Sequence, residues 1–144
     1  MIDLKPYLDM TIMMVLATQD EQGNPYTSNI YFGYAPDAYT CYFISRLTRE
    51  HSQHILWKNN VAWSIVHSEQ WWNDDSNKIW LQFQWIAKLL EWAEAQDIFD
   101  THYQPRILIP WGLPEGHYIF ECRPTSVKIW DEALFWSDGM VIKL

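Results

Sequence analysis

Short segments of apolar or alternating residues, separated by polar turns, occur along the first third of the chain and are typical of β-strands. Residues 11–18 form an apolar run, and residues 26–34 and 39–45 are rich in Tyr, Thr, Ile and Phe, which are frequent in strands. Polar stretches with Gly or Pro separate these segments at residues 20–25 and 35–38. The order predicts an antiparallel meander of three strands.

A helical pattern follows at residues 48–59. Thr48 is the predicted N-cap, and Glu50 lies in the first turn, where a carboxylate interacts favourably with the helix dipole. Residues 61–67 return to a strand pattern, whereas residues 68–78 are polar except for two tryptophans and predict a loop.

Residues 79–90 carry the clearest alternation in the chain and predict a long, half-buried strand. Its polar face contains Gln82, Gln84 and Lys88, with Ile86 as the exception. Its apolar face, which we expect to contact the core, consists of Leu81, Phe83, Trp85, Ala87 and Leu89.

The last third of the chain combines one predicted helix with further strands. Residues 94–103 have apolar side chains at helical spacing, and Pro105 is predicted to end that helix. Residues 117–123 and 126–131 predict two strands on either side of a proline. The dipeptide Asp138-Gly139 between short apolar runs indicates a hairpin.

The predicted elements add up to roughly six to eight strands and two short helices, which favours a barrel over an open sheet. With 144 residues, 49% of them hydrophobic, the chain can bury a core without a disulfide or a metal. It contains no internal repeat and no linker. We therefore expect residues 1–144 to form a single domain.

Composition narrows the classes of partner. A net charge of −8 disfavours nucleic acid and acidic membranes, because both attract positive surfaces. The apolar run at residues 12–17 is too short for a signal sequence or a membrane span, so we expect a cytoplasmic protein. Cys41 and Cys122 lack metal-ligand spacing and lie in strand patterns, which favours buried free thiols. The ten tryptophans indicate an aromatic core, or a surface for a partner or a planar ligand.

Motifs of the common catalytic classes do not occur in the sequence. It has no glycine-rich dinucleotide or P-loop fingerprint and no nucleophile elbow. His51 and His54 could share one face of the predicted helix, but no third metal ligand accompanies them. Asp74 and Asp75 lie in a polar segment that could hold calcium, although a solvated loop explains them better. We therefore expect no metal site.

The segment between residues 45 and 51 combines groups that bind phosphate. It follows a predicted strand and opens a helix, and it places Ser45, Arg46, Thr48, Arg49 and His51 beside free helix N–H groups. Such a combination suits a phosphate monoester. A capped helix with two solvated arginines explains the same pattern, and the pattern alone favours that simpler explanation.

Several short motifs follow one another in a characteristic order. An apolar strand precedes D-x-x-G-x-P, a strand with T-S-N before aromatic residues, Y-F-I-S, T-R-x-H-S at a helix start, and N-N-V-A before the next strand. Y-x-P and Y-I-F-E-C-R-P-T-S-V-K-I-W-D follow later in the chain. In this order, and most clearly over residues 13–66, the motifs resemble the pyridoxamine 5′-phosphate oxidase-like FMN-binding split-barrel superfamily.

The resemblance implies a fold, a cofactor and an assembly. The fold would be mainly β, a six-stranded antiparallel split β-barrel with two short flanking helices. The cofactor would be FMN, in an oxidoreductase of the pyridoxamine 5′-phosphate oxidase-like class whose small-molecule substrate is not specified. Two chains would form a homodimer with both FMN sites at the interface.

The resemblance also assigns positions to the FMN site. The family's phosphate-binding hydroxyl and arginine fall on Thr48 and Arg49, and His51 is close enough to assist. Further positions on the second strand line the phosphate and the flavin ring, and Ser45 ends the third strand beside them. The predicted cofactor-binding residues are Ser28, Asn29, Ile30, Tyr31, Ser45, Arg46, Thr48, Arg49 and His51.

Two hypotheses follow, because the chain departs from the family pattern. The true oxidase has basic residues near the positions of Ser28 and Gly33 and another just after Arg49. This chain lacks all three, and Glu50 occupies the last position. Their loss removes support for pyridoxamine-phosphate oxidase activity itself. The first hypothesis is a flavoprotein in which FMN performs the redox chemistry. The second is a non-enzymatic split-barrel dimer that binds no flavin, or another planar ligand such as haem or a deazaflavin.

Overall fold

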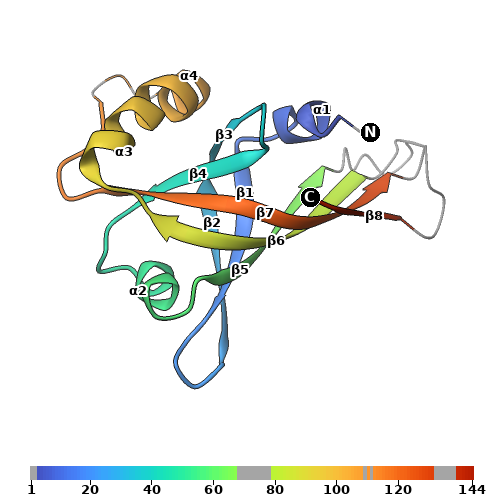
Figure 1. Cartoon of the computed structure of the whole chain (residues 1–144), viewed down its shortest axis with the longest axis horizontal. Helices are drawn as coiled ribbons and strands as arrows, with labels where there is room; N and C mark the ends of the chain where they lie inside the picture. Colours follow the sequence, from blue (N-terminus) through green and yellow to red (C-terminus); the bar gives the residue numbers. More distant parts are fainter. Residues whose placement is uncertain (1–2, 68–78, 109, 111, 132–138) are drawn as a thin grey trace, which may run out of the picture.

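The computed structural model describes residues 3–67, 79–108, 110, 112–131 and 139–144. Within these residues, eight strands form one antiparallel sheet that curls toward itself (Figure 1). The strands are β1 (Met13–Gln19), β2 (Pro25–Tyr31), β3 (Gly33–Ala35), β4 (Thr40–Ser45), β5 (Asn60–His67), β6 (Ile79–Leu89), β7 (Tyr118–Asp131) and β8 (Met140–Lys143).

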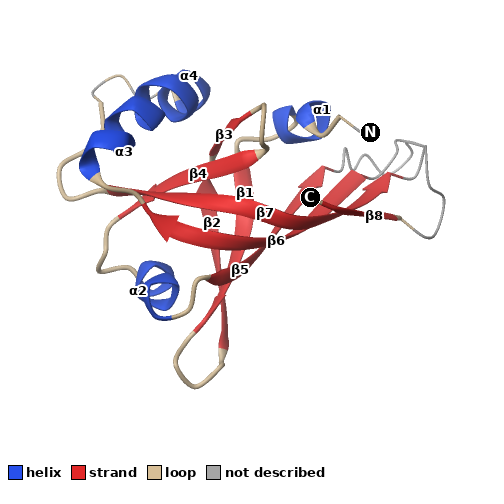
Figure 2. Cartoon of the chain, viewed as in Figure 1, coloured by secondary structure: helices blue, strands red, loops and turns tan. Residues whose placement is uncertain are grey.

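Short helices lie around the sheet (Figure 2). One of them, α2, contacts β1, β2 and β6, and the π-helical segment η1 contacts β3 and β4. In chain order the helices are α1 (Lys5–Asp9), α2 (Glu50–Trp57), α3 (Trp92–Ile98), η1 (Phe99–Tyr103) and α4 (Gln104–Ile107).

The order of the strands explains why the sheet curls. Neighbours follow the path β2-β1-β5-β6-β7-β4-β3, with β8 added beside β7. The two margins of this path are therefore β2 and β3, yet only Phe32 separates these strands in the chain. The sheet must bend until its margins approach each other, and β2 does contact β4. The result is a barrel that remains split between β2 and the end of β4.

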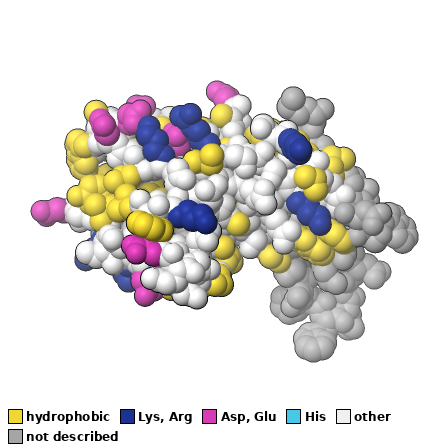
Figure 3. Space-filling model, turned by 60° about the horizontal axis from the view of Figure 1, so that its bottom comes forward, with side chains coloured by type: hydrophobic (Ala, Val, Ile, Leu, Met, Phe, Trp, Pro, Cys, Tyr) yellow, Lys and Arg dark blue, Asp and Glu magenta, His cyan; other side chains and the backbone are white. Residues whose placement is uncertain are grey.

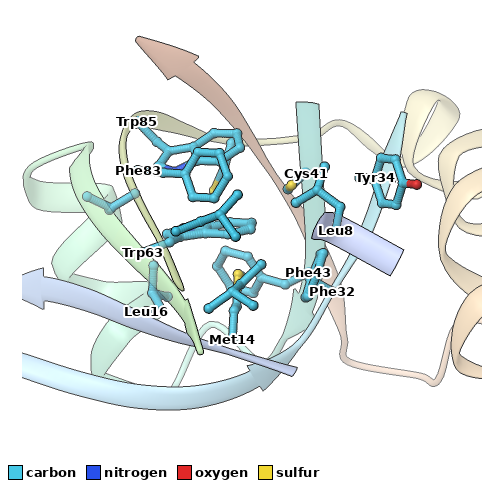
Figure 4. Packing of buried hydrophobic residues seen from close by; sticks show 14 of the residues in the cluster. Leu8, Met14, Leu16, Phe32, Tyr34, Cys41, Phe43, Trp63, Phe83 and Trp85 are labelled. Atoms are coloured by element: carbon cyan, nitrogen blue, oxygen red, sulfur yellow. The ribbon is translucent and has the colours of Figure 1, made fainter. Parts of the chain in front are cut away.

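Aromatic side chains fill the inside of this half-barrel (Figure 4). The rings of Trp63 and Trp85 stack with centroids 4.6 Å apart, and Phe43 stacks on Phe120 at 5.0 Å. Both tryptophans are almost fully buried, so part of the tryptophan excess forms the core. Burial of such large rings supplies much of the apolar stabilisation of a small barrel.

The prediction for residues 79–90 is confirmed by β6. Leu81, Phe83, Trp85 and Ala87 are buried, and the residues between them are exposed, including the exceptional Ile86. A sheet with one solvated face produces this alternation because successive side chains point to opposite faces.

Two predicted strand boundaries differ from the structure. The single strand expected at residues 26–34 is divided at Phe32, whose N–H donates to the carbonyl of Ile12 (3.0 Å). The two strands expected around Pro124 form the one long strand β7 instead. Its register shifts opposite Gln84 and Trp85, and the Thr125 hydroxyl donates to the Gln84 carbonyl (3.0 Å). This bulge accommodates a proline, which has no N–H for the ladder.

Two helix predictions are wrong in detail. The N-cap of α2 is Arg49, in an extended conformation, and not Thr48. Pro105 does not end the helical region, because it lies in the first turn of α4, where its missing N–H costs little. The chain leaves α4 at Leu108, in the left-handed conformation (φ 57°).

The remaining sequence predictions divide into confirmed and untested ones. Cys41 and Cys122 are free and buried, as expected, and they lie opposite each other on β4 and β7. Burial raises the pKa of both thiols. The predicted loop at residues 68–78, with its carboxylate pair, and Asp138 of the hairpin signal lie outside the described residues. No helix in the described part of the chain is long and apolar enough to span a membrane.

Candidate functional site

A cleft of about 460 Å³ opens where the barrel is split. We call it the split cleft; β2, the end of β4 and the start of α2 form most of its walls. It brings together eight of the nine predicted cofactor residues: Ser28, Asn29, Ile30, Tyr31, Ser45, Arg46, Arg49 and His51. The ninth, Thr48, is exposed and does not line the cleft.

His51 joins the two sides of the split. Its Nδ1 lies 3.1 Å from the Ser28 hydroxyl on β2, and its Nε2 lies 2.8 Å from the Ser45 hydroxyl on β4. The ring also packs edge-on against Phe43 at 6.0 Å. A side chain from the first turn of α2 thus replaces the backbone ladder that would otherwise close the barrel.

One arrangement of protons satisfies all the contacts around His51. Ser28 donates to Nδ1, and the Nε2–H donates to the Ser45 oxygen, which also accepts from the Ser52 hydroxyl at 3.1 Å. Ser45 then donates to the Arg46 carbonyl at 3.3 Å. This arrangement needs a neutral ring. Burial, and then the nearby Arg49 and His54, lower the pKa of His51, which favours that neutral form.

The ionised side chains of the split cleft leave a small positive surplus. Arg46 and Arg49 contribute two guanidinium groups, and Glu50 contributes one carboxylate. All three are exposed at the rim. The first N–H groups of α2 lack helical partners by geometry and carry the positive end of the helix dipole. Hydroxyls, guanidinium groups and helix N–H groups together can bind a phosphate monoester.

Three ring-bearing residues of the split cleft were not predicted: Tyr26, Tyr103 and His117. Tyr103 comes from η1, far from β2 in sequence, and its ring stacks on Phe99 at 5.8 Å. The Y-x-P motif contains Tyr103, but nothing local in the sequence shows which segment will cover the split.

Gly33 allows η1 to come this close. A Cβ built on Gly33 would lie 2.3 Å from the His102 carbonyl oxygen and 2.9 Å from the Tyr103 Cα. Such distances exclude any side chain, so the absence of a Cβ lets the backbones of β3 and η1 touch. This contact seats Tyr103 at the cleft.

A wider groove of about 790 Å³ lies on the solvent-facing side of the sheet. We call it the outer groove. Its lining residues on β1, β5 and β6 are mostly small or carry amides: Val15, Ala17, Ala62, Ser64, Gln82 and Gln84. Two lysines, Lys128 and Lys143, lie at its β7 and β8 side. Figure 3 shows one face of the molecule with exposed hydrophobic side chains between separate Lys and Arg side chains.

Comparisons with known proteins identify the fold. No family model and no curated protein matches the chain. Among solved structures, a heme binding protein from Mycobacterium smegmatis has a TM-score of 0.74 and 15% identity over 94% of this chain. This chain covers only 56% of that protein.

Two further solved structures are similar in fold. A candidate pyridoxamine 5′-phosphate oxidase from Listeria innocua has a TM-score of 0.65 and 13% identity, covering 88% of this chain and 96% of its own. HutZ, a heme storage protein from Vibrio cholerae, has a TM-score of 0.60 and 16% identity, covering 85% of this chain and 91% of its own. At such identities the likeness shows the fold alone. The fold is mainly β and matches the split barrel of these proteins, as the sequence predicted, although the described residues contain eight strands and five helical segments where six strands and two helices were expected.

Proposed function

We propose that the chain binds FMN in the split cleft and acts as an FMN-dependent oxidoreductase. The observation that carries the proposal is the convergence of Ser28, Ser45, Arg49 and His51 at the split. They come from β2, β4 and the start of α2, and they occupy the positions that the family resemblance assigns to the cofactor. A phosphate group needs the hydroxyl, guanidinium and N–H donors that meet there.

The residues of the split cleft fit a flavin phosphate. Two guanidinium groups exceed the single carboxylate of Glu50, so a dianion is attracted on balance. The volume of the split cleft, about 460 Å³, lies within the range of small-molecule sites. Glu50 weakens the attraction, and we expect a lower affinity than a site with a third cation would have.

The residues of this chain would hold the cofactor and keep it oriented. Bound FMN supplies the hydride and single-electron chemistry. Arg46 and Arg49 would bind the phosphate, and Ser28 and Ser45 would be held in place by His51. Because both ring nitrogens of His51 are engaged by hydroxyls, we assign it a positioning role.

Flavin binding is tested by titrating the purified protein with FMN while recording tryptophan fluorescence and the visible spectrum. We expect saturable quenching and a perturbed flavin spectrum. Arg49→Ala should weaken FMN binding by about 10- to 100-fold, because a hydrogen bond to a charged group is lost. Thr48→Ala is the matched control. Thr48 is next to Arg49 in the chain but does not line the cleft, so this variant should bind FMN as the wild type does. Fluorescence that does not respond to FMN would exclude the proposal.

We also propose that two chains form a homodimer through the outer groove. Val15, Val66 and Val141 are exposed on this side of the sheet, as is Met13. Met13 pairs in register with Tyr31, which also lines the split cleft. A second copy on this face would therefore reach the cofactor site. Light scattering coupled to size-exclusion chromatography is expected to give twice the mass of one chain, and a monomer would refute the dimer.

Haem is the second candidate ligand. Two of the similar solved structures are named for heme binding or storage, and His117 lies at the split cleft with its Nδ1 directed to the Glu115 carbonyl (3.2 Å). Its Nε2 is then available to a metal. Under this alternative the protein would be a non-enzymatic binder. Titration with hemin distinguishes the two, because a sharp Soret band that disappears in His117→Ala would favour haem.

A further inference from the structure

Tyr103 presents a buried hydroxyl to the split cleft without a partner in the protein. Its side chain is 2% exposed and lines the cleft. Within the described residues no hydrogen bond is made by its hydroxyl, whereas the buried Tyr34 hydroxyl donates to Asp9 at 2.7 Å. Among the described residues, three side-chain atoms are fully shielded from solvent and have no hydrogen-bond partner: Trp63 Nε1, Trp85 Nε1 and Arg106 Nε. The Tyr103 hydroxyl is not one of them, so it opens to the cleft. A buried tyrosine hydroxyl normally finds a partner.

The position of Tyr103 is fixed by its surroundings. The π-helical turn of η1 places Phe99 and Tyr103 together, both buried and with stacked rings. His102, the residue before it, stacks on Tyr42 at 5.8 Å, and its carbonyl rests against Gly33. π-helical turns are rare and are often found at functional sites. A hydroxyl held this firmly is preorganised to meet a ligand.

Tyr103 and His51 both line the split cleft, but they lie near different residues of β2: Tyr103 interacts with Tyr31, and His51 contacts Ser28. Ser28, which contacts His51, and Tyr31 are three residues apart on β2, a separation of about 10 Å at 3.4 Å per residue. Burial raises the pKa of Tyr103, and the nearby Tyr31 raises it further by charge repulsion. Its hydroxyl therefore remains a donor at neutral pH. The split cleft therefore combines guanidinium groups and serines with a single phenol donor.

We propose that the Tyr103 hydroxyl binds the part of the ligand that lies beyond its phosphate. The split cleft would then select a phosphate monoester that carries a hydrogen-bond acceptor in the part of the molecule beyond the phosphate. This inference rests on the proposed function, because it places the phosphate at Arg49. In FMN the corresponding part is the ribityl chain and the ring system.

The test compares Tyr103→Phe with Arg49→Ala, using FMN and riboflavin as probes. Tyr103→Phe is expected to weaken both flavins by about 5- to 10-fold, the loss of one neutral hydrogen bond. Arg49→Ala is expected to weaken FMN alone, because riboflavin has no phosphate. If riboflavin binds too weakly to measure, the double variant Tyr103→Phe/Arg49→Ala tests whether the two side chains bind different parts of FMN. Its loss of FMN affinity should equal the product of the two single losses, since groups that share no contact and bind different parts of a ligand act independently.

Tyr34→Phe is the matched control. It removes a hydroxyl that donates to Asp9 outside the cleft. We expect it to lower the melting temperature and leave FMN affinity unchanged. Tyr103→Phe should leave the melting temperature unchanged and weaken FMN binding, because its hydroxyl has no partner within the protein to lose.

Each outcome has a separate meaning. Unchanged flavin affinity in Tyr103→Phe, together with weaker FMN binding in Arg49→Ala, would overturn the role of Tyr103 and leave the FMN site intact. A fall in melting temperature equal to that of Tyr34→Phe would show a partner inside the protein and also overturn it. A wild-type protein that binds neither flavin would remove the proposed function, and this inference with it.

Discussion

His51 is the residue on which the split cleft depends most. It connects Ser28 on β2 with Ser45 on β4 through both ring nitrogens. Its pKa lies below the ordinary 6.5 because of burial and of neighbouring Arg49 and His54, and the adjacent Glu50 opposes this shift only in part. The folded protein therefore prefers the neutral ring, whereas the unfolded chain takes up a proton near pH 6.5.

This difference predicts a pH dependence of stability. A lowered pKa in the folded state gives a contribution that is complete above pH 6.5 and is lost as the pH falls toward the folded-state pKa. In His51→Gln that contribution is absent. The difference in unfolding free energy between wild type and His51→Gln, from urea titrations, should shrink as the pH falls below 6.5. A difference that stays constant over this range would contradict the assignment of a neutral ring.

Arg106 has a comparable role at the opposite margin. Its guanidinium group binds Asp9 at 3.1 Å and the carbonyls of Leu8 and Thr11, and it lies over the Phe32 ring at 4.8 Å. It thereby anchors α1 and the β2–β3 junction to α4. A mostly buried guanidinium with several acceptors contributes more than an exposed ion pair.

Arg106→Met is expected to lower the free energy of unfolding by about 2–3 kcal/mol, because buried carbonyl acceptors lose a charged donor. Lys88→Met is the control, since Lys88 forms an ion pair with Glu94 in which both side chains are exposed, and it should change stability by less than about 1 kcal/mol. Thermal and urea unfolding measure both. Equal effects would argue against the anchoring role.

At the scale of elements, the sequence predicts what local periodicity determines. β6 is recognisable because one face is buried along its whole length. The division at Phe32 and the bulge at Thr125 depend on where neighbouring strands lie, and no local pattern carries that information. The prediction that Pro105 ends a helix is wrong because a proline is equally compatible with the first turn of a new helix.

The candidate site follows the same division. The segment from Ser45 to His51 could be predicted because hydroxyls, arginines and a helix start follow one another in the sequence, whereas the β2 residues were assigned by the family resemblance alone. Tyr103 and His117 could not be predicted, because closure of the sheet brings them to β2 from distant parts of the chain.

The packing of η1 on β3 predicts the effect of a single methyl group. Gly33→Ala would place a Cβ 2.3 Å from the His102 carbonyl oxygen, and the two elements must then separate. We expect a loss of about 1–3 kcal/mol in unfolding free energy. FMN binding should also weaken, since Tyr103 moves with η1. Chemical unfolding and FMN titration measure the two effects, and unchanged stability would contradict the close contact.

At the scale of the whole molecule, the proposed dimer depends on the outer groove. The chain carries a net charge of −8, so a symmetric interface that gains a carboxylate from each copy should dissociate. Ala62 is exposed at the centre of this face and lines the groove.

Ala62→Glu is expected to convert the proposed dimer into a monomer and to lower FMN affinity at the same time, because in the proposed dimer the second copy would complete the cofactor site. Gln22→Glu adds the same charge in the exposed turn before β2 and should leave both properties unchanged. Light scattering and FMN titration provide the measurements. A dimeric Ala62→Glu protein would place the interface elsewhere.

The closure of the barrel by side chains also determines how the protein fluctuates. β6 pairs with a strand on each side, β5 and β7, whereas β2 pairs with β1 alone and is held to β4 across the split by the His51 bridge. Amide hydrogens along β2 should therefore exchange with deuterated solvent through small local openings, and those of β6 only through global unfolding. A ligand that binds both sides of the split would act as a latch, and protection of β2 from exchange would report its arrival.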